Sequence, residues 1–161
     1  MNTTPKSEIL KATPPGLQEV VQTFRDKLGQ ELIGIAMFGS TARGEAHSDS
    51  DWDIFIVTRK LPSNPFERQI LLRSLLPKRI GTKVSLLAKT EQEFEHRLLP
   101  VYLDIAIDAV ILFDPQGYLE RKFERIKEIM EREGLVRKRV RRTWVWVWKK
   151  SRGRDWELDW Q

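Results

Sequence analysis

The sequence has 161 residues, with 28 Lys and Arg, 23 Asp and Glu, two His and no Cys. This length suits one ordinary domain with a real core. The absence of Cys excludes disulfides and thiolate metal sites, and two His are too few for an ordinary zinc centre, so we expect any metal to be held by oxygen.

The first helix is expected after a polar leader, residues 1–16, which lacks the basic and apolar regions of a signal peptide. No apolar run approaches the roughly 20 residues needed to span a bilayer, so we expect a soluble, cytoplasmic protein. Residues 17–28 then carry apolar side chains at helical spacing, and Gly29 is placed to end that helix.

Two strands are expected next, on either side of a polar loop. Residues 31–40 are a short apolar run rich in Ile, and residues 52–58 are rich in β-branched and aromatic side chains. A second helix is expected over 65–76, with Asn64 and Pro65 as its N-cap and first residue. Its broad apolar face consists of Phe66, Ile70, Leu72, Leu75 and Leu76.

The following segments predict alternating strands and helices, which favours an α+β fold with helices packed on a mixed sheet. Residues 83–89 are expected to form a strand, and residues 90–99 a charged helix with capping-box residues Thr90 and Glu93. Segment 102–114 is ambiguous, and we divide it into a short helix and a strand. Residues 118–133 then carry an amphipathic helical stripe, which Gly134 can close.

The C-terminal extension, residues 137–161, differs from the domain formed by residues 1–136, since it holds nine Lys and Arg before any acidic residue. Trp144, Trp146 and Trp148 alternate with Val, as in a strand, and residues 155–160 are a candidate partner strand in a C-terminal hairpin. We favour packing of the Trp face on the domain over stacking on nucleic-acid bases; a protein-binding surface is a third option.

The loop between the first two strands lies within MFGSTARGEAHSDSDWDIFIV, residues 37–57. Gly39 and Gly44 have the spacing of a phosphate loop, but Glu-Ala follows where Lys and then Ser or Thr are needed. A calcium loop starting at Asp49 requires Gly and Glu at its sixth and twelfth positions, which hold Ile and Lys. Both motifs are therefore excluded.

A pair of carboxylates remains at the start of the second strand. Strand alternation places Asp51 and Asp53 on one side, where they repel each other unless a cation lies between them. Magnesium takes oxygen ligands and is commonly shared between carboxylates and substrate phosphates. Gly39 allows backbone amides to approach a phosphate and the Ser40 hydroxyl can donate to it, so the loop predicts a site for a metal-bound nucleoside triphosphate.

These residues resemble a known family. Phe38, Gly39 and Ser40, followed after ten residues by Asp51, Trp, Asp53 and Ile, are similar to the signature of the DNA polymerase β-like nucleotidyltransferase superfamily, and particularly to its minimal nucleotidyltransferase (MNT) members. The resemblance extends loosely over residues 17–135. It implies a polymerase β-like α+β fold and Mg²⁺-dependent transfer of a nucleoside monophosphate from a nucleoside triphosphate, with ATP expected, to an acceptor hydroxyl.

The resemblance also implies roles for single residues. Asp51 and Asp53 would be catalytic metal ligands, while Gly39 and Ser40 would bind the β and γ phosphates. Arg43, whose guanidinium fork matches phosphate geometry, is our choice for a further phosphate contact. Asp49, in contrast, is expected to be an ordinary loop residue, and His47 and His96 are expected to lie on the surface.

One position departs from the family pattern. Active members commonly carry a third carboxylate on a later strand, where this chain has Ser85. Asp104 or Asp108 could supply it instead, the enzyme could be slow, or only nucleotide binding could remain. As an enzyme, the protein is expected to be an antitoxin that modifies a HEPN-domain partner; the alternative is a weak or inactive fold that binds protein or RNA.

Overall fold

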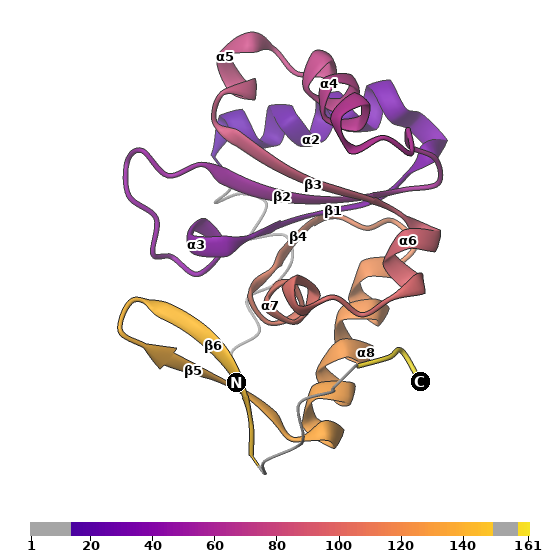
Figure 1. The fold of residues 1–161 in the computed structure, drawn as a ribbon. Coiled ribbons are helices and arrows are strands. Elements are labelled where there is room, and N and C mark those ends of the chain that lie inside the picture. Colours follow the sequence, from indigo (N-terminus) through magenta and orange to yellow (C-terminus); the bar gives the residue numbers. More distant parts are fainter. Residues whose placement is uncertain (1–13, 150–157) are drawn as a thin grey trace.

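A four-stranded mixed sheet lies between two layers of helices in the computed structural model, which describes residues 14–149 and 158–161 (Figure 1). β1 is antiparallel to β2 and to β4, whereas β2 and β3 run parallel. The mixed sheet with helices confirms the predicted fold class. The strands in spatial order are β3 (Val84–Thr90), β2 (Trp52–Thr58), β1 (Leu32–Phe38) and β4 (Val110–Phe113).

One face of the sheet is covered by three helices, α2 (Pro15–Leu28), α4 (Pro65–Leu75) and α5 (Lys78–Gly81) (Figure 1). Alternation along β2 turns Ile54 and Ile56 toward these helices, where both side chains are fully buried. The helix predicted at residues 17–28 is confirmed, and the short 3₁₀ helix η1 (Gly29–Glu31) links it to β1.

The opposite face of the sheet is covered by α6 (Glu91–His96), α7 (Pro100–Asp108) and α8 (Tyr118–Glu133). Phe55 and Val57 of β2 enter this second core. The predicted capping box of Thr90 and Glu93 is present, but α6 is shorter than the helix predicted over 90–99. The short helix and strand predicted within residues 102–114 are present as α7 and β4. The helix begins slightly earlier than predicted, at Pro100, whose fixed φ and missing N–H suit a first helical position.

The predicted apolar face of α4 is wrong for two of its residues. Phe66 and Ile70 are 72% and 54% exposed, whereas Arg68 is buried. Arg68 faces inward because its guanidinium donates to the Pro62 and Ala88 carbonyls and pairs with Glu93. Helical periodicity identified the helix but did not identify the face that it buries.

The C-terminal hairpin consists of β5 (Leu135–Val140) and β6 (Thr143–Trp148). The predicted Trp strand is therefore correct, but its partner is β5 and not residues 155–160. Of that candidate partner, Leu158–Trp160 form no strand and the remainder lies outside the described residues. The division of the chain at residue 136 falls within β5 and stays a prediction.

The two faces of the hairpin differ in their contacts. Cross-strand pairing joins Trp148 to Leu135, Trp146 to Arg137 and Trp144 to Arg139 on one face. Trp146 and Trp148 pack against the core that includes α7 and α8. Packing of the Trp face on the domain was our favoured interpretation, and these contacts agree with it.

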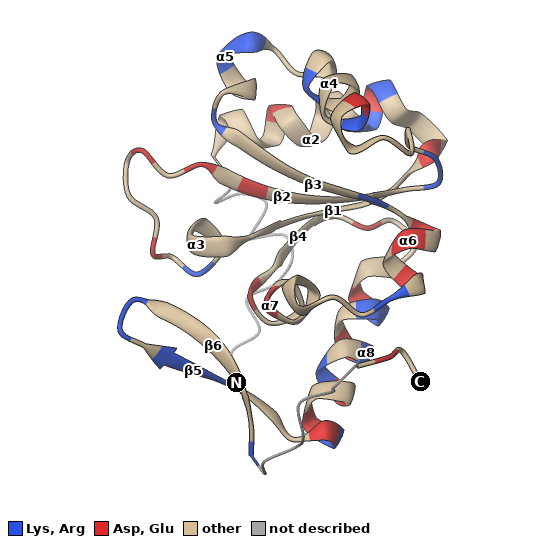
Figure 2. Cartoon of the chain, viewed as in Figure 1, with Lys and Arg blue, Asp and Glu red and all other residues tan. Residues whose placement is uncertain are grey.

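Basic residues are concentrated on β5 and the hairpin turn (Figure 2). In the part of the chain that the structure describes, no helix combines the length and the apolar character needed to cross a membrane.

Candidate active site

The motif loop lies at one end of the central strands. β1 ends at Phe38, and the short helix α3 (Gly39–Ala42) follows directly. Register pairs Phe38 with Asp53 on β2, and Asp53 in turn with Ser85 on β3. The sheet therefore brings Gly39, Asp53 and Ser85 together from three segments.

Asp51 directly precedes β2, and Asp53 is the second residue of that strand; the two are close enough for their charges to interact. Asp51 is exposed and Asp53 is half-buried, while Trp52 packs into the core on the other face of the sheet. Burial and the negative charge of Asp51 raise the pKa of Asp53, and a hydrogen bond from Ser85 and the charge of Arg43 offset part of this rise. Two ionised carboxylates at Asp51 and Asp53 therefore repel each other when no cation lies between them.

Gly39 allows the loop to approach Asp53. Its φ is +73°, in the left-handed region, and a Cβ at this position would overlap with the Asp53 carboxylate. The turn that follows is closed by two hydrogen bonds: Glu45 N donates to Ser40 O (2.9 Å), and Thr41 Oγ1 donates to Asp51 O (3.3 Å). The aspartate pair and the Gly-Ser turn are thus fixed against each other.

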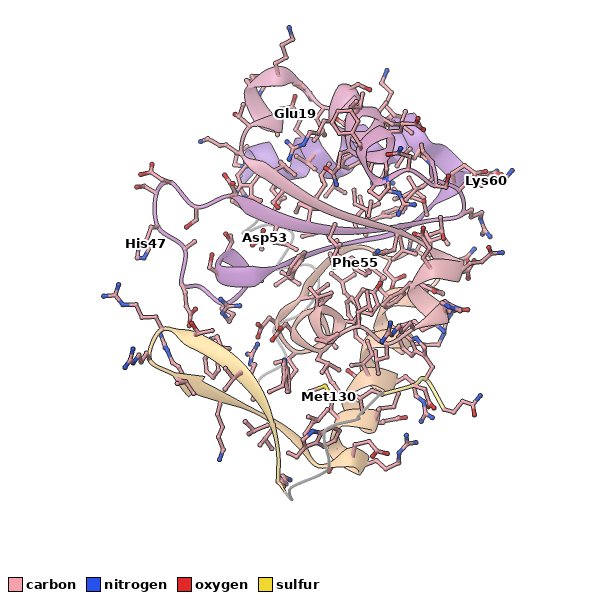
Figure 3. The ribbon with its side chains drawn as sticks, in the orientation of Figure 1. Glu19, His47, Asp53, Phe55, Lys60 and Met130 are labelled. Carbon is pink, nitrogen blue, oxygen red and sulfur yellow. The ribbon has the colours of Figure 1, made fainter. Side chains whose placement is uncertain are left out.

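The two histidines and Asp49 are exposed. His47 and Asp49 are exposed on the motif loop, and Figure 3 shows His47 on its outer part, away from Asp53. His96 is the last residue of α6 and is exposed. The predicted surface positions of the two histidines are confirmed, and Asp49 lies in the loop, as expected.

Comparison with known proteins identifies the family. Residues 17–150 match the nucleotidyltransferase domain family. The chain is also 30% identical over 120 residues to "Putative protein adenylyltransferase MJ1305" of Methanocaldococcus jannaschii, covering 72% of this chain and 82% of that protein. The chain belongs to the nucleotidyltransferase family.

Solved structures share the predicted fold. A toxin–antitoxin structure with AMP-PNP superposes with a TM-score of 0.54 at 18% identity, covering 71% of this chain and 86% of the other. A second toxin–antitoxin structure, MntA-HepT, gives a TM-score of 0.50 at 15% identity, with coverages of 73% and 86%. The resemblance to minimal nucleotidyltransferases is confirmed, and the protein belongs to a class of enzymes.

The carboxylates of this nucleotidyltransferase fit a divalent cation that arrives with its substrate. No group of three or more acidic or histidine side chains that could hold a metal occurs among the described residues. Magnesium, however, is commonly bound by one or two carboxylates together with substrate phosphates. Asp51 and Asp53 supply that number, and a cation would relieve the repulsion that raises the pKa of Asp53.

The two candidates for a third carboxylate, Asp104 and Asp108, bind other groups. Asp108 accepts hydrogen bonds from Arg137 at 2.6 and 2.7 Å and from Arg43 at 3.1 Å. Burial would raise the pKa of Asp108, but these two arginines outweigh it and lower the pKa. Asp104 accepts from Arg137 at 3.3 Å and from the Trp146 indole at 3.2 Å.

Arg137 is the residue that sequence reasoning missed at this site. The sequence places it only within a basic extension, because no local pattern predicts a strand over residues 135–140. Had β5 been predicted, alternation would have placed Arg137 on the same face as the tryptophans and therefore against the domain. Its position beside Asp108 still depends on how the hairpin docks, which no local pattern encodes.

Proposed function

We propose that the protein transfers a nucleoside monophosphate to a hydroxyl group on a partner protein, with ATP as the expected donor. The observation that carries this proposal is the aspartate pair held against the Gly-Ser turn at the family's spacing. The relative from M. jannaschii is named as a putative protein adenylyltransferase, which supports adenosine monophosphate as the transferred group and protein as the acceptor. One structure of the same fold is a toxin–antitoxin with AMP-PNP, which supports a partner protein, and we propose one of the HEPN type.

In the proposed reaction the acceptor hydroxyl oxygen attacks the α phosphorus and its proton is released to water, while the bond from this phosphorus to the oxygen that bridges it to the β phosphorus breaks and pyrophosphate leaves. Gly39 and Ser40 bind the β and γ phosphates, and Arg43 adds a charged contact. Mg²⁺ bound by Asp51 and Asp53 would offset negative charge on the attacking and leaving oxygens. Ser85 donates to Asp53 and so helps to orient that carboxylate.

A binding module without catalysis is the second candidate, and Ser85 is the observation that favours it. This residue pairs in register with Asp53, where active relatives commonly have a carboxylate, and serine cannot act as a carboxylate at neutral pH. The two candidates differ in one measurable property, the formation of a covalent nucleotide product.

The test uses α-labelled ATP, CTP, GTP and UTP with Mg²⁺. The acceptors offered are the protein itself, a purified HEPN-domain protein and bulk RNA. We expect label on the HEPN-domain protein with ATP, and a loss of about a hundredfold or more in Asp53→Asn. Asp49→Asn is the matched control, because it removes a charge from the same loop outside the pair. Label retained in Asp53→Asn, or none with any nucleotide and acceptor, would contradict the proposed activity.

A further inference from the structure

The C-terminal hairpin and the aspartate pair lie on the same side of the sheet. Asp53 shares its side of β2 with Phe55 and Val57, which enter the core formed with α6, α7 and α8. Hairpin residues Trp146 and Trp148 pack against that same core. Figure 1 shows β5 and β6 beside α7, on the side of the sheet where α3 and the motif loop lie.

A buried carboxylate joins the hairpin to Arg43 on the motif loop, and a longer, exposed ion pair between Arg139 and Glu45 (3.9 Å) joins the same two segments. Arg137 forms a bidentate pair with Asp108, through Nη1 at 2.6 Å and Nη2 at 2.7 Å. The same carboxylate accepts from Arg43 Nη1 at 3.1 Å. The Asp108 side chain is 6% exposed and that of Arg137 is 12% exposed, so water screens these contacts little.

The contacts of Arg43 fix the orientation of its guanidinium. Nε donates to Glu45 at 3.0 Å and Nη1 donates to Asp108, so the plane of the group is held at two points. Nη2 has no hydrogen-bond partner among the described residues, and it remains available for an incoming oxyanion. A planar fork held in this way loses little entropy when it binds phosphate.

Arg137 also limits how strongly Asp108 can hold Arg43. Arg137 neutralises Asp108, and it does so on both carboxylate oxygens. Without Arg137, Asp108 would be free to take further donors from Arg43 and to draw it away from the turn. With Arg137 in place, Asp108 divides its charge between two arginines, so Arg43 keeps its position and Nη2 stays open to a ligand.

We propose that Asp108 and Arg137 are positioning residues that hold Arg43 toward the triphosphate, so that the C-terminal hairpin completes the nucleotide site. The inference rests on the proposed function, because it takes Arg43 as a phosphate contact. In this proposal Asp108 orients Arg43 and does not serve as a third metal ligand. It also gives the basic hairpin a role in nucleotide affinity.

The test measures the affinity for a non-hydrolysable ATP analogue with Mg²⁺ by titration calorimetry, which requires no acceptor. We expect Arg137→Ala and Asp108→Asn each to weaken binding about tenfold, as loss of an orienting partner does at other sites. Arg137→Lys, which keeps the charge but not the fork, should weaken binding less. Lys138→Ala is the matched control: it removes the same charge from the next residue, which pairs with Val145 on the other face of the hairpin.

A double-mutant cycle separates positioning from a general structural effect. In an Arg43→Ala background, Arg137→Ala should weaken binding no further, because it acts through Arg43. Thermal melts verify that each variant is folded. If Arg137→Ala is not folded, Arg137→Lys replaces it in the cycle. The inference is overturned if Arg137→Ala has the same effect with or without Arg43, if Lys138→Ala matches it, or if the unmodified protein binds no analogue. Binding with the expected pattern but without label transfer would overturn the proposed function alone.

Discussion

At the scale of single residues, the site depends on one close approach. Gly39 has φ +73° and Gly44 has φ +72°, so both occupy the left-handed region. They differ in their surroundings: a Cβ on Gly39 would overlap with the Asp53 carboxylate, whereas a Cβ on Gly44 would meet nothing within 4 Å. A side chain at either glycine would therefore strain the backbone to a similar degree, but only a side chain at position 39 would also displace Asp53.

This difference gives a matched pair of variants. We expect Gly39→Ala and Gly44→Ala each to lower the free energy of unfolding by about 1–2 kcal/mol, the cost of a left-handed alanine. Only Gly39→Ala should also displace Asp53, and it should lower label transfer about a hundredfold. Urea denaturation and the transfer assay measure the two effects. Equal losses of activity in both variants would mean that the loop conformation, and not the contact with Asp53, is what matters.

The residues of the site differ in how far the sequence could predict them. Asp51 and Asp53 could be placed on one side because strand alternation is a local rule, and Gly39 was identified by its spacing to them. Arg137 could not be placed beside Asp108, which is 29 residues earlier in the chain. That contact follows from tertiary docking, for which no local periodicity exists.

At the scale of secondary-structure elements, α4 shows how one ion pair can decide which helix face is buried. The Arg68 guanidinium makes bonds to Glu93 at 2.8 Å and to the Pro62 and Ala88 carbonyls. Through Ala88, and through a bond from Gln69 to Leu86 O at 2.9 Å, α4 covers the outer edge of β3. Donors from the helix thus satisfy carbonyls that an unpaired edge strand would expose.

The charge of Glu93 is therefore expected to contribute to stability. The hydrogen bond from Arg68 lowers the pKa of Glu93. Glu93→Gln keeps the shape and the capping box but removes the charge, and we expect a loss of about 1–2 kcal/mol, between the values for exposed and buried pairs. Because the folded pKa is lowered, this contribution is present above the ordinary carboxyl value of 4.5 and is lost as the pH falls through the folded pKa.

Urea denaturation at pH 7 and at acidic pH measures this contribution, and the gap between the unmodified protein and Glu93→Gln should close in acid. Glu19→Gln is the control, since Glu19 and Glu93 are 36% and 40% exposed, but their arginine partners, Arg79 and Arg68, are 69% and 8% exposed. We expect Glu19→Gln to cost less than 1 kcal/mol. A gap for Glu93→Gln that persists in acid would show that the charge is not its source.

At the scale of the whole molecule, the sequence predicted the sheet and most helices, but not how the C-terminal part returns to the domain. β1, β2 and β3 are continuous, largely apolar segments, so their strand character is evident locally. β5, with the sequence LVRKRV, has low β propensity and forms a strand because β6 pairs with it and both dock on the domain. Tertiary context decided this element.

The return of the chain is completed by Trp160, and its contacts lead to a test of the whole arrangement. Its indole packs edge-on against Phe94 with centroids 5.2 Å apart and donates to Phe94 O at 3.1 Å, while Lys122 lies 5.2 Å from its ring.

We expect Trp160→Ala to lower the free energy of unfolding by about 2–3 kcal/mol, below the cost at a fully buried site because the residue is half-buried. Trp160→Phe keeps a ring against Phe94 but removes the donor, and it should cost about 1 kcal/mol. Urea denaturation ranks the two variants; an Ala variant as stable as the unmodified protein would mean that these C-terminal residues do not stabilise the domain.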